Sequence, residues 1–292
     1  MRTMRIDGDA FAGAARGGQT ATTRDSAPAP PSQTTLALLD VFEGGRAWYV
    51  WGLLGWHDIR QRYRRSKIGP FWLTISMGAL VGGLGFLYAG MFGVEVADYL
   101  PFVALGFIVW GLIASLINEN CNAFIEAETI GKQVHLPLSI HVYRVVWRNL
   151  IIFGHNILIF VVVAVIFSIW PGWTGLLAVA GLALLCLNGV WIGLLFGLIS
   201  ARFRDVPLIV ASIVQIAFFL TPIIWKPDLL PDRAWFLHFN PFYHFLELVR
   251  APLLGEIPSL VSWSAVLVIT LCGWIATLFM YRRYRRRIAY WL

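Results

Sequence analysis

Charged residues and cysteines are scarce in this sequence. Only 13% of its 292 residues are Asp, Glu, Lys or Arg, and 58% are hydrophobic. An ordinary soluble domain is about 25% charged, so this composition excludes a soluble fold and predicts an integral membrane protein. The three cysteines have no paired spacing, and we therefore expect neither a disulfide framework nor a zinc site.

Charge is absent altogether from several long stretches, and these stretches predict the membrane spans. A helix needs about 20 apolar residues to cross roughly 30 Å of hydrocarbon. The longest uncharged stretch, 149–201, is long enough for two helices around a turn at Pro171-Gly172. We therefore predict an all-α fold with six transmembrane helices, at about 70–92, 101–118, 149–168, 174–199, 206–225 and 257–281.

Basic residues are unevenly distributed among the connecting segments. With a cytoplasmic N-terminus, the segments on the cytoplasmic side hold 20 of the 23 Lys and Arg residues, and these segments are 1–68, 119–148, 202–205 and 282–292. Because positively charged loops stay in the cytoplasm, the sequence predicts that both termini are cytoplasmic (N-in, C-in).

Two segments precede the six-span domain, which we assign to residues 68–292. Residues 1–35 are rich in Ala, Gly, Thr and Pro, and they predict a disordered tail. Residues 36–67 place Tyr49, Trp56 and Ile59 at helical spacing ahead of a basic end, which is typical of an amphipathic helix in the membrane interface. Anchoring to anionic lipid and contact with a cytoplasmic partner are both open roles for this helix.

The segment between the fifth and sixth spans, 226–256, carries more apolar residues than a solvated loop needs. We predict two short re-entrant helices in the outer leaflet, broken at Asn240-Pro241. Non-helical backbone at membrane depth is tolerated only against protein or a water-filled cavity. The segment is therefore expected to line an exit.

Two spans carry glycines at four-residue spacing, which allows close helix packing. Gly78 and Gly82 form one pair, and Gly189, Gly193 and Gly197 form a longer ridge. We favour packing inside one subunit over a subunit interface for both.

Catalytic motifs are missing as well. None of the three lysines, Lys67, Lys132 and Lys226, lies in a Walker A motif. No Asp or Glu lies inside a predicted span, and His155 is the only ionisable side chain there. This disfavours ion-coupled transport, and we expect a neutral His155 hydrogen-bonded between helices. No arrangement of carboxylates or metal-ligating residues has catalytic spacing, so the sequence predicts no catalytic residue and no metal site.

Aromatic residues make up 15% of the chain, and most are expected in the interfacial belts. Six lie deeper in the predicted spans, where they fill the bundle or line a path: Phe86, Trp110, Trp191, Phe218, Phe219 and Trp274. Ring faces stack on the apolar faces of sugars, at about 0.5–1.5 kcal/mol per aromatic contact. We expect Phe218 and Phe219 first among them to line a path for sugar.

Three stretches resemble the membrane subunits of type-2 ABC exporters for polysaccharides. They are residues 62–72 (RYRRSKIGPFW) at the entry to the first span, the cytoplasmic loop 122–137, and the outer segment 240–255 (NPFYHFLELVRAPLLG). The likeness covers about residues 40–292, in order and spacing. It is greatest to permeases for lipid-linked O-antigen and to the galactan exporters of actinobacteria.

The resemblance implies a permease of the cytoplasmic (inner) membrane that exports an undecaprenyl-linked polysaccharide and catalyses no reaction itself. It also implies a homodimer that pairs with two copies of a cytoplasmic ABC ATPase. ATP and Mg²⁺ would bind to that ATPase, so this chain needs no cofactor. Its other contacts would be membrane lipids, and it would bind no nucleic acid.

The resemblance further implies three groups of functional residues. The ATPase-coupling group is Arg60, Arg62, Arg64, Arg65, Asn122, Glu126, Glu128 and Lys132. The substrate path is Phe71, Trp72, Phe86, Phe218, Phe219 and Trp225. The outer gate is Asn240, Pro241, Tyr243, His244, Glu247 and Arg250.

Two of these groups suggest specific chemistry. Glu247 and Arg250 are three apart on a helix, where they can pair and brace the gate or form an exposed pair of little consequence. Arg60, Arg62 and Arg64 are also expected to attract the lipid pyrophosphate, as polybasic segments attract anionic headgroups.

Two alternatives are kept. The first is an ABC permease for teichoic acid or drugs. The second, from another class, is a multispan membrane enzyme or secondary transporter that works without an ATPase.

Overall fold

The computed structural model describes residues 32–62, 64, 69, 71–127, 136–227 and 231–291. Within these ranges the regular structure is entirely helical, which confirms the all-α prediction. The predicted disordered tail lies outside the described residues, apart from its last four positions. Arg65, Glu128 and Lys132 of the predicted coupling group also lie outside them.

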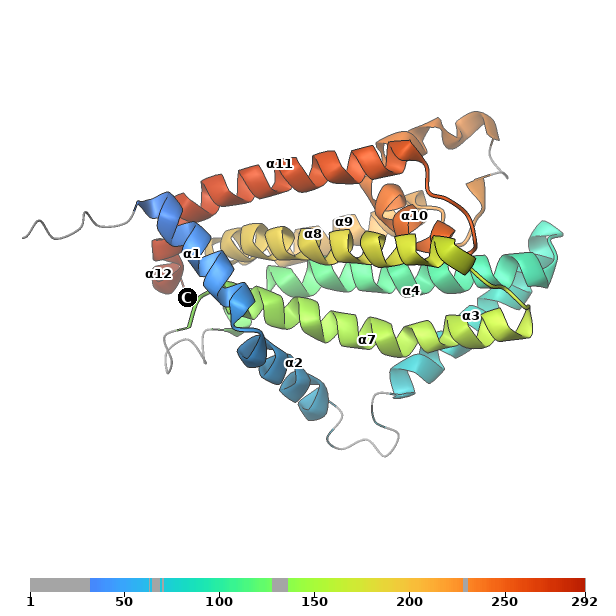
Figure 1. Cartoon of the computed structure of the whole chain (residues 1–292), viewed down its shortest axis with the longest axis horizontal. Coiled ribbons are helices and arrows are strands. Elements are labelled where there is room, and N and C mark those ends of the chain that lie inside the picture. The colour runs from blue at the N-terminus through green and yellow to red at the C-terminus, as the bar shows by residue number, and fades with distance from the viewer. Residues whose placement is uncertain are drawn as a thin grey trace, which may run out of the picture. The chain divides into compact units, whose positions relative to one another are not determined.

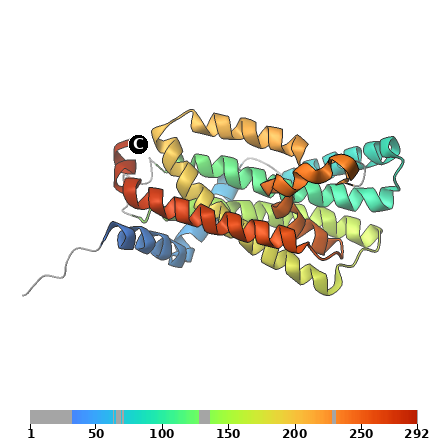
Figure 2. The same ribbon diagram turned by 90° about the horizontal axis from the view of Figure 1, so that it is seen from above.

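Five helices are long and apolar enough to cross a membrane. They are α3 (Phe71–Phe92), α4 (Val96–Cys121), α7 (Ser139–Ile166), α8 (Gly175–Arg202) and α11 (Leu260–Tyr284). Figures 1 and 2 show α4, α7, α8 and α11 running side by side. Five of the six predicted spans therefore correspond to long helices of the structure.

The remaining predicted span is a shorter helix. Helix α9 (Val206–Leu220) has 15 residues, which is about 22 Å at 1.5 Å per residue. It ends because Pro222 cannot continue the helical hydrogen bonds and disfavours a helical residue before it; Thr221 has an extended backbone. The chain then turns back into the bundle, where Ile223 is buried.

Helix α4 is the centre of the bundle. Most of its residues are buried, including Leu105, Val109 and Leu116, and α3, α7, α8, α9 and α10 (Pro241–Leu253) all pack against it. A helix with apolar residues on every side is suited to this position, because it meets protein all around.

The glycine ridge of α8 faces this core. A Cβ atom on Gly189 would lie 3.2 Å from Leu116, and one on Gly197 would lie 3.1 Å from Phe124. Packing within one subunit is therefore confirmed for this ridge. The pair on α3 differs, since Gly82 faces open space and Gly78 has Ile159 no nearer than 3.9 Å.

The predicted interfacial segment 36–67 is two helices rather than one. Helix α1 (Gln33–Arg46) begins at the N-cap Ser32, and α2 (Trp48–Arg62) follows a break at Ala47. Each has a buried and an exposed side: Ala37 is buried and Phe42 exposed on α1, and Ile59 is buried and Tyr49 exposed on α2. The break lets each helix pack its own inner face on the bundle.

The segment before α11 contains the two predicted short helices. The 3-10 helix η3 (Pro231–Phe239) ends at Asn240, whose side chain accepts hydrogen bonds from the backbone of Phe242 and Tyr243 and so caps α10. Pro241 is favourable at the first position of that helix because its missing N–H is not needed there. The break predicted at Asn240-Pro241 is confirmed.

Four short elements complete the described chain: α5 (Ala123–Glu126), η1 (Gly172–Thr174), η4 (Arg285–Arg287) and α12 (Ile288–Trp291).

Candidate functional site

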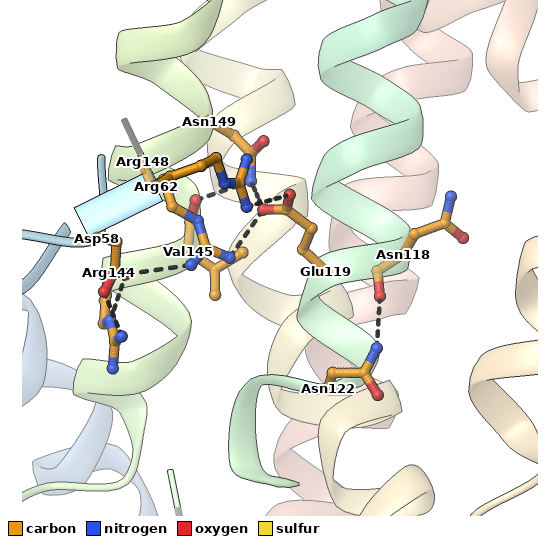
Figure 3. Close-up of polar contacts among 9 residues, drawn as sticks. All are labelled: Asp58, Arg62, Asn118, Glu119, Asn122, Arg144, Val145, Arg148 and Asn149. Carbon is orange, nitrogen blue, oxygen red and sulfur yellow. Dashed lines mark hydrogen bonds and ion pairs between the residues drawn. The ribbon is translucent and has the colours of Figure 1, made fainter. Parts of the chain in front are cut away.

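Arginines of α7 join α2 to α4 through a set of ion pairs, which we call the α2–α4–α7 network: Asp58, Arg62, Glu119, Arg144, Arg148 and Asn149. Arg144 and Arg148 are four apart, so both side chains lie on one face of α7. The Nε atom of Arg144 donates to Asp58 at 2.6 Å, and Arg148 donates to the same carboxylate at 3.1 Å. Figure 3 shows these side chains meeting between the helices.

The second carboxylate of the network is Glu119, in the last turn of α4. It accepts from Arg148 at 2.9 Å and from Asn149 at 2.7 Å, while Arg62 lies 3.7 Å away. The side chain of Arg148 is only 7% exposed. Removing one partner of a buried ion pair costs about 3–5 kcal/mol because the other charge is left uncompensated. The network therefore fixes α2 to the bundle.

The network lies where helices α4 and α7 extend beyond the predicted spans. Helix α7 begins at Ser139, and α4 continues to Cys121, so both helices include charged residues that hydropathy placed in loops. His155 itself bonds to the carbonyl of Ile151 in its own helix, and its ring contacts Phe71 of α3. The available signal for the network was the spacing of the two arginines.

A second buried carboxylate, Asp40, attaches α1 to both α7 and α11. It accepts from the backbone N–H groups of Leu138 and Ser139 at 3.2 and 3.1 Å, and from the hydroxyl of Tyr281 at 2.9 Å. Arg285 pairs with it at 2.8 Å. An acidic group at the start of a helix satisfies free N–H groups and interacts favourably with the helix dipole. Sequence reasoning missed Asp40, because nothing in the sequence indicates that its face of α1 is the buried one.

The described residues of the predicted coupling group surround these two attachments. Arg60 and Arg62 end α2, and Arg64 is exposed just beyond it. Asn122 joins α4 to α5 and donates to Asn118 at 3.4 Å, and Glu126 is exposed at the end of α5. Among the described residues of this group, Arg62 alone belongs to the network itself.

The predicted outer-gate residues gather on and beside α10. The predicted pair of Glu247 and Arg250 is confirmed, and it is not an exposed one, because Arg250 is 2% exposed. Arg250 also donates to the carbonyl of Pro222 at 2.6 Å, and its guanidinium lies 4.1 Å from the ring centre of Phe102.

The neighbouring gate residues are held by separate contacts. His244 is buried between the Ser262 hydroxyl and the His238 carbonyl, each at 3.0 Å. Asn240 also donates to Thr221 at 3.0 Å, which ties α10 to the end of α9. A cavity of about 560 Å³ beside this cluster is lined by Tyr243, Glu247 and Arg250 together with residues of α4.

The predicted substrate-path aromatics fall into two sets. Phe218 is half-buried against the bundle, with its ring centre 5.8 Å from those of both Phe107 and Trp110. Trp225 is half-buried and donates to the Phe219 carbonyl at 3.4 Å. The exposed set lies on α3 and α9 and consists of Phe71, Trp72, Phe86 and Phe219.

Phe71 and Phe86 lie about 22 Å apart along α3, so the chain by itself does not bring these rings into one site. The deep aromatic Trp110 is 7% exposed, as expected for a residue that fills the bundle. Among the described residues, no group of three or more His, Cys, Asp and Glu side chains is placed to hold a metal ion.

Comparison with known proteins finds a matching family and several similar transport proteins. Residues 49–254, from α2 to the end of α10, match the family described as ABC-2 type transporter. An O-antigen export system permease protein RfbA of Klebsiella pneumoniae is 25% identical over 63% of this chain and 72% of its own length. The RfbA protein of Myxococcus xanthus is 23% identical over 75% of this chain and 86% of its own. The polysialic acid transport protein KpsM of Escherichia coli is 23% identical over 77% and 89%.

Proposed function

Because the chain belongs to the ABC-2 type transporter family, we propose that it is the permease subunit of an ATP-driven exporter whose cargo is a lipid-linked polysaccharide. It is a multi-pass protein of the cytoplasmic membrane, and its five long apolar helices fit that location. The observation that carries the proposal is the alignment with two O-antigen export permeases and a polysialic acid transport protein, which extends over most of the chain. Within this class, the cargo is an undecaprenyl-linked glycan of the O-antigen or galactan type.

The topology we propose has six crossings with both termini in the cytoplasm. Helix α9 supplies the fifth crossing together with the non-helical Thr221–Trp225 segment, whose backbone is sheltered against protein. The η3 and α10 helices then re-enter the outer leaflet. The concentration of Lys and Arg on one side supports this orientation.

The energy source in this proposal is a separate ATPase, present in two copies, that holds ATP and Mg²⁺. Its docking surface is formed by α2, α5 and the loop 122–137. Asp40 and the α2–α4–α7 network support this assignment, because they join α1, α2 and the start of α7 into one rigid end of the bundle. A movement of any of these elements by the ATPase is then transmitted along α4 and α7.

The conduit in this proposal forms between two copies of the chain. The exposed faces of α3 and α9 carry the rings of Phe71, Trp72, Phe86 and Phe219. Many weak ring contacts, at about 0.5–1.5 kcal/mol each, suit a glycan that must slide. At the outer end, the Glu247–Arg250 pair holds α10 in place as the gate.

Depletion of the permease in cells tests the cargo. The expected result is accumulation of a lipid-linked glycan on the cytoplasmic side, because synthesis continues while export stops. Unchanged glycan pools combined with new drug sensitivity would instead indicate a drug permease. A build-up of polyol-phosphate polymer would indicate teichoic acid.

A further inference from the structure

Arginines crowd the end of α11 and the short element that follows it. Arg282 and Arg283 lie in the last turn of α11, and η4 consists of three further arginines, Arg285–Arg287. Helix α12 then packs against α8, with the side chain of Ile288 buried. Figures 1 and 2 show this segment at the same end of the bundle as α1.

Two aromatic rings of this segment support guanidinium groups. The ring centres of Tyr284 and Trp291 are 6.1 Å apart, and both side chains pack against the core. The guanidinium groups of Arg283 and Arg287 lie over the Tyr284 ring, 5.7 and 5.8 Å from its centre. Arg202, at the end of α8, lies over the Trp291 ring at 5.2 Å. We call these five residues the arginine platform.

The arginines of the platform keep their hydrogen-bond donors. Attraction to a ring face positions a guanidinium group without using its N–H donors. Arg202, Arg283 and Arg287 are exposed, and no carboxylate in the described part of the chain lies within ion-pair distance of them. Asp40, the carboxylate attached to this end of α11, is bonded to Arg285 and Tyr281 instead. The platform is therefore open to an external anion, and the rigid fork of arginine suits phosphate oxygens.

The position of the platform along α11 indicates that this phosphate belongs to a lipid. Helix α11 is long and apolar enough to cross a membrane, and its exposed Phe279 lies only four residues before Arg283, or about 6 Å along the helix. Beyond the platform, Tyr290 is exposed beside Trp291. Aromatic and basic residues at the end of such a helix are typical of the headgroup layer.

We propose that the arginine platform binds the headgroup of an anionic phospholipid of the phosphatidylglycerol type and thereby holds α12 against the end of α8. A headgroup that carries an amine fits less well, because it places another cation beside three arginines. The inference goes beyond the proposed function and depends on neither the cargo nor the ATPase. The platform lies on α8, α11 and α12, whereas the exposed rings of the proposed conduit lie on α3 and α9.

Photo-crosslinking of the full chain, with any co-purified partner in place, tests the site in nanodiscs of equal parts phosphatidylglycerol and phosphatidylcholine. Tyr290→benzoylphenylalanine places the reactive group next to Trp291. Leu260→benzoylphenylalanine, at an exposed position in the first turn of α11, is the control at the other end of that helix. Mass spectrometry identifies the attached lipid. We expect phosphatidylglycerol to exceed phosphatidylcholine at least tenfold at position 290 and to equal it at position 260.

Three substitutions in the Tyr290→benzoylphenylalanine background separate the platform from diffuse attraction to basic loops. Arg287→Gln should lower the lipid preference about fivefold and leave the unfolding temperature unchanged, because its side chain is exposed. Arg204→Gln removes the same charge from the exposed turn after α8 and should leave the preference unchanged. Trp291→Leu keeps every charge but should lower the preference, because Arg202 loses the ring beneath it.

Equal labelling by the two lipids at position 290 would overturn the proposal. Equal losses in Arg204→Gln and Arg287→Gln would also overturn it, because diffuse attraction would then explain the preference. Displacement of phosphatidylglycerol by added undecaprenyl pyrophosphate would assign the platform to the cargo. Loss of a co-purified ATPase in Arg287→Gln, with unchanged lipid labelling, would assign it to a protein partner. Failure of the wild-type chain to retain any ATPase would count against the proposed function and leave the platform standing.

Discussion

Asp40 and Ser139 lie 99 positions apart in the sequence, and Asp40 accepts two hydrogen bonds from Ser139. The Ser139 N–H donates to the Asp40 carboxylate at 3.1 Å, and the Ser139 hydroxyl donates to the Asp40 carbonyl at 2.6 Å. Ser139 is the first residue of α7 and follows the predicted coupling loop. The N-terminal helix is therefore attached directly to the point where the loop re-enters the bundle.

Neutralising this carboxylate should loosen that attachment. Asp40→Asn keeps the shape of the side chain but removes the charge that pairs with Arg285. We expect a loss of about 3–5 kcal/mol in stability, since Arg285 loses its buried partner, and ATP hydrolysis that no longer drives export. Thermal unfolding and glycan export in cells measure the two effects. Glu43→Gln, at an exposed position of the same helix, is the control and should behave like the wild type.

The α2–α4–α7 network should respond strongly to loss of its central arginine. Arg148→Met leaves Asp58 and Glu119 with one fewer cation, and we expect a loss of about 3–5 kcal/mol. Adding Asp58→Leu should cost less than the sum of the two single changes, because both changes remove the same Arg148–Asp58 contact and the double variant loses it only once. Chemical or thermal unfolding in detergent measures this coupling. Additive losses, or an equal loss in the exposed Arg204→Met control, would show that the network is not a unit.

At the outer end, Arg250 should not be replaceable by lysine. A lysine keeps the charge but cannot donate at once to Glu247 and the Pro222 carbonyl while stacking on Phe102. We expect Arg250→Lys to lower stability by about 2–3 kcal/mol and to reduce export. Arg204→Lys, in an exposed turn, is the matched control. Wild-type unfolding and export in Arg250→Lys would mean that charge alone holds the gate.

Alanine substitutions of the two adjacent phenylalanines of α9 should have different effects, one on stability and the other on export. Phe218→Ala removes a ring packed against Phe107 and Trp110, and it should destabilise the protein by about 3 kcal/mol. Phe219 is 68% exposed, so Phe219→Ala should leave the unfolding temperature unchanged while slowing export. Measurements of the unfolding temperature and the export rate of both variants test this difference between Phe218 and Phe219. Equal stability losses in both variants would place Phe219 in the core and remove it from the conduit.

The sequence predicted the elements that depend on local composition. Uncharged stretches gave five helices at nearly the right positions, and Asn240-Pro241 gave the break before α10 because capping and proline geometry are local effects. The pairing of Glu247 with Arg250 was likewise readable from helical spacing. These features need no knowledge of which helices are neighbours.

Features that depend on tertiary neighbours could not be predicted in this way. Asp40 is a single acidic residue in an amphipathic segment, and only contact with α7 and α11 makes it a cap. Arg144 and Arg148 were assigned to a loop because hydropathy ends a span at the first charge, whereas paired charges can continue the helix. The shortening of α9 depends on Pro222, whose effect was outweighed by the apolar residues around it.

Reconstitution in liposomes tests the central claim, that this chain is a conduit with no energy source of its own. The purified chain alone should hydrolyse no ATP and move no lipid-linked glycan against its gradient. Addition of the co-purified ATPase with ATP and Mg²⁺ should produce outward movement of the glycan. ATP hydrolysis or uphill transport by the chain alone would contradict the account.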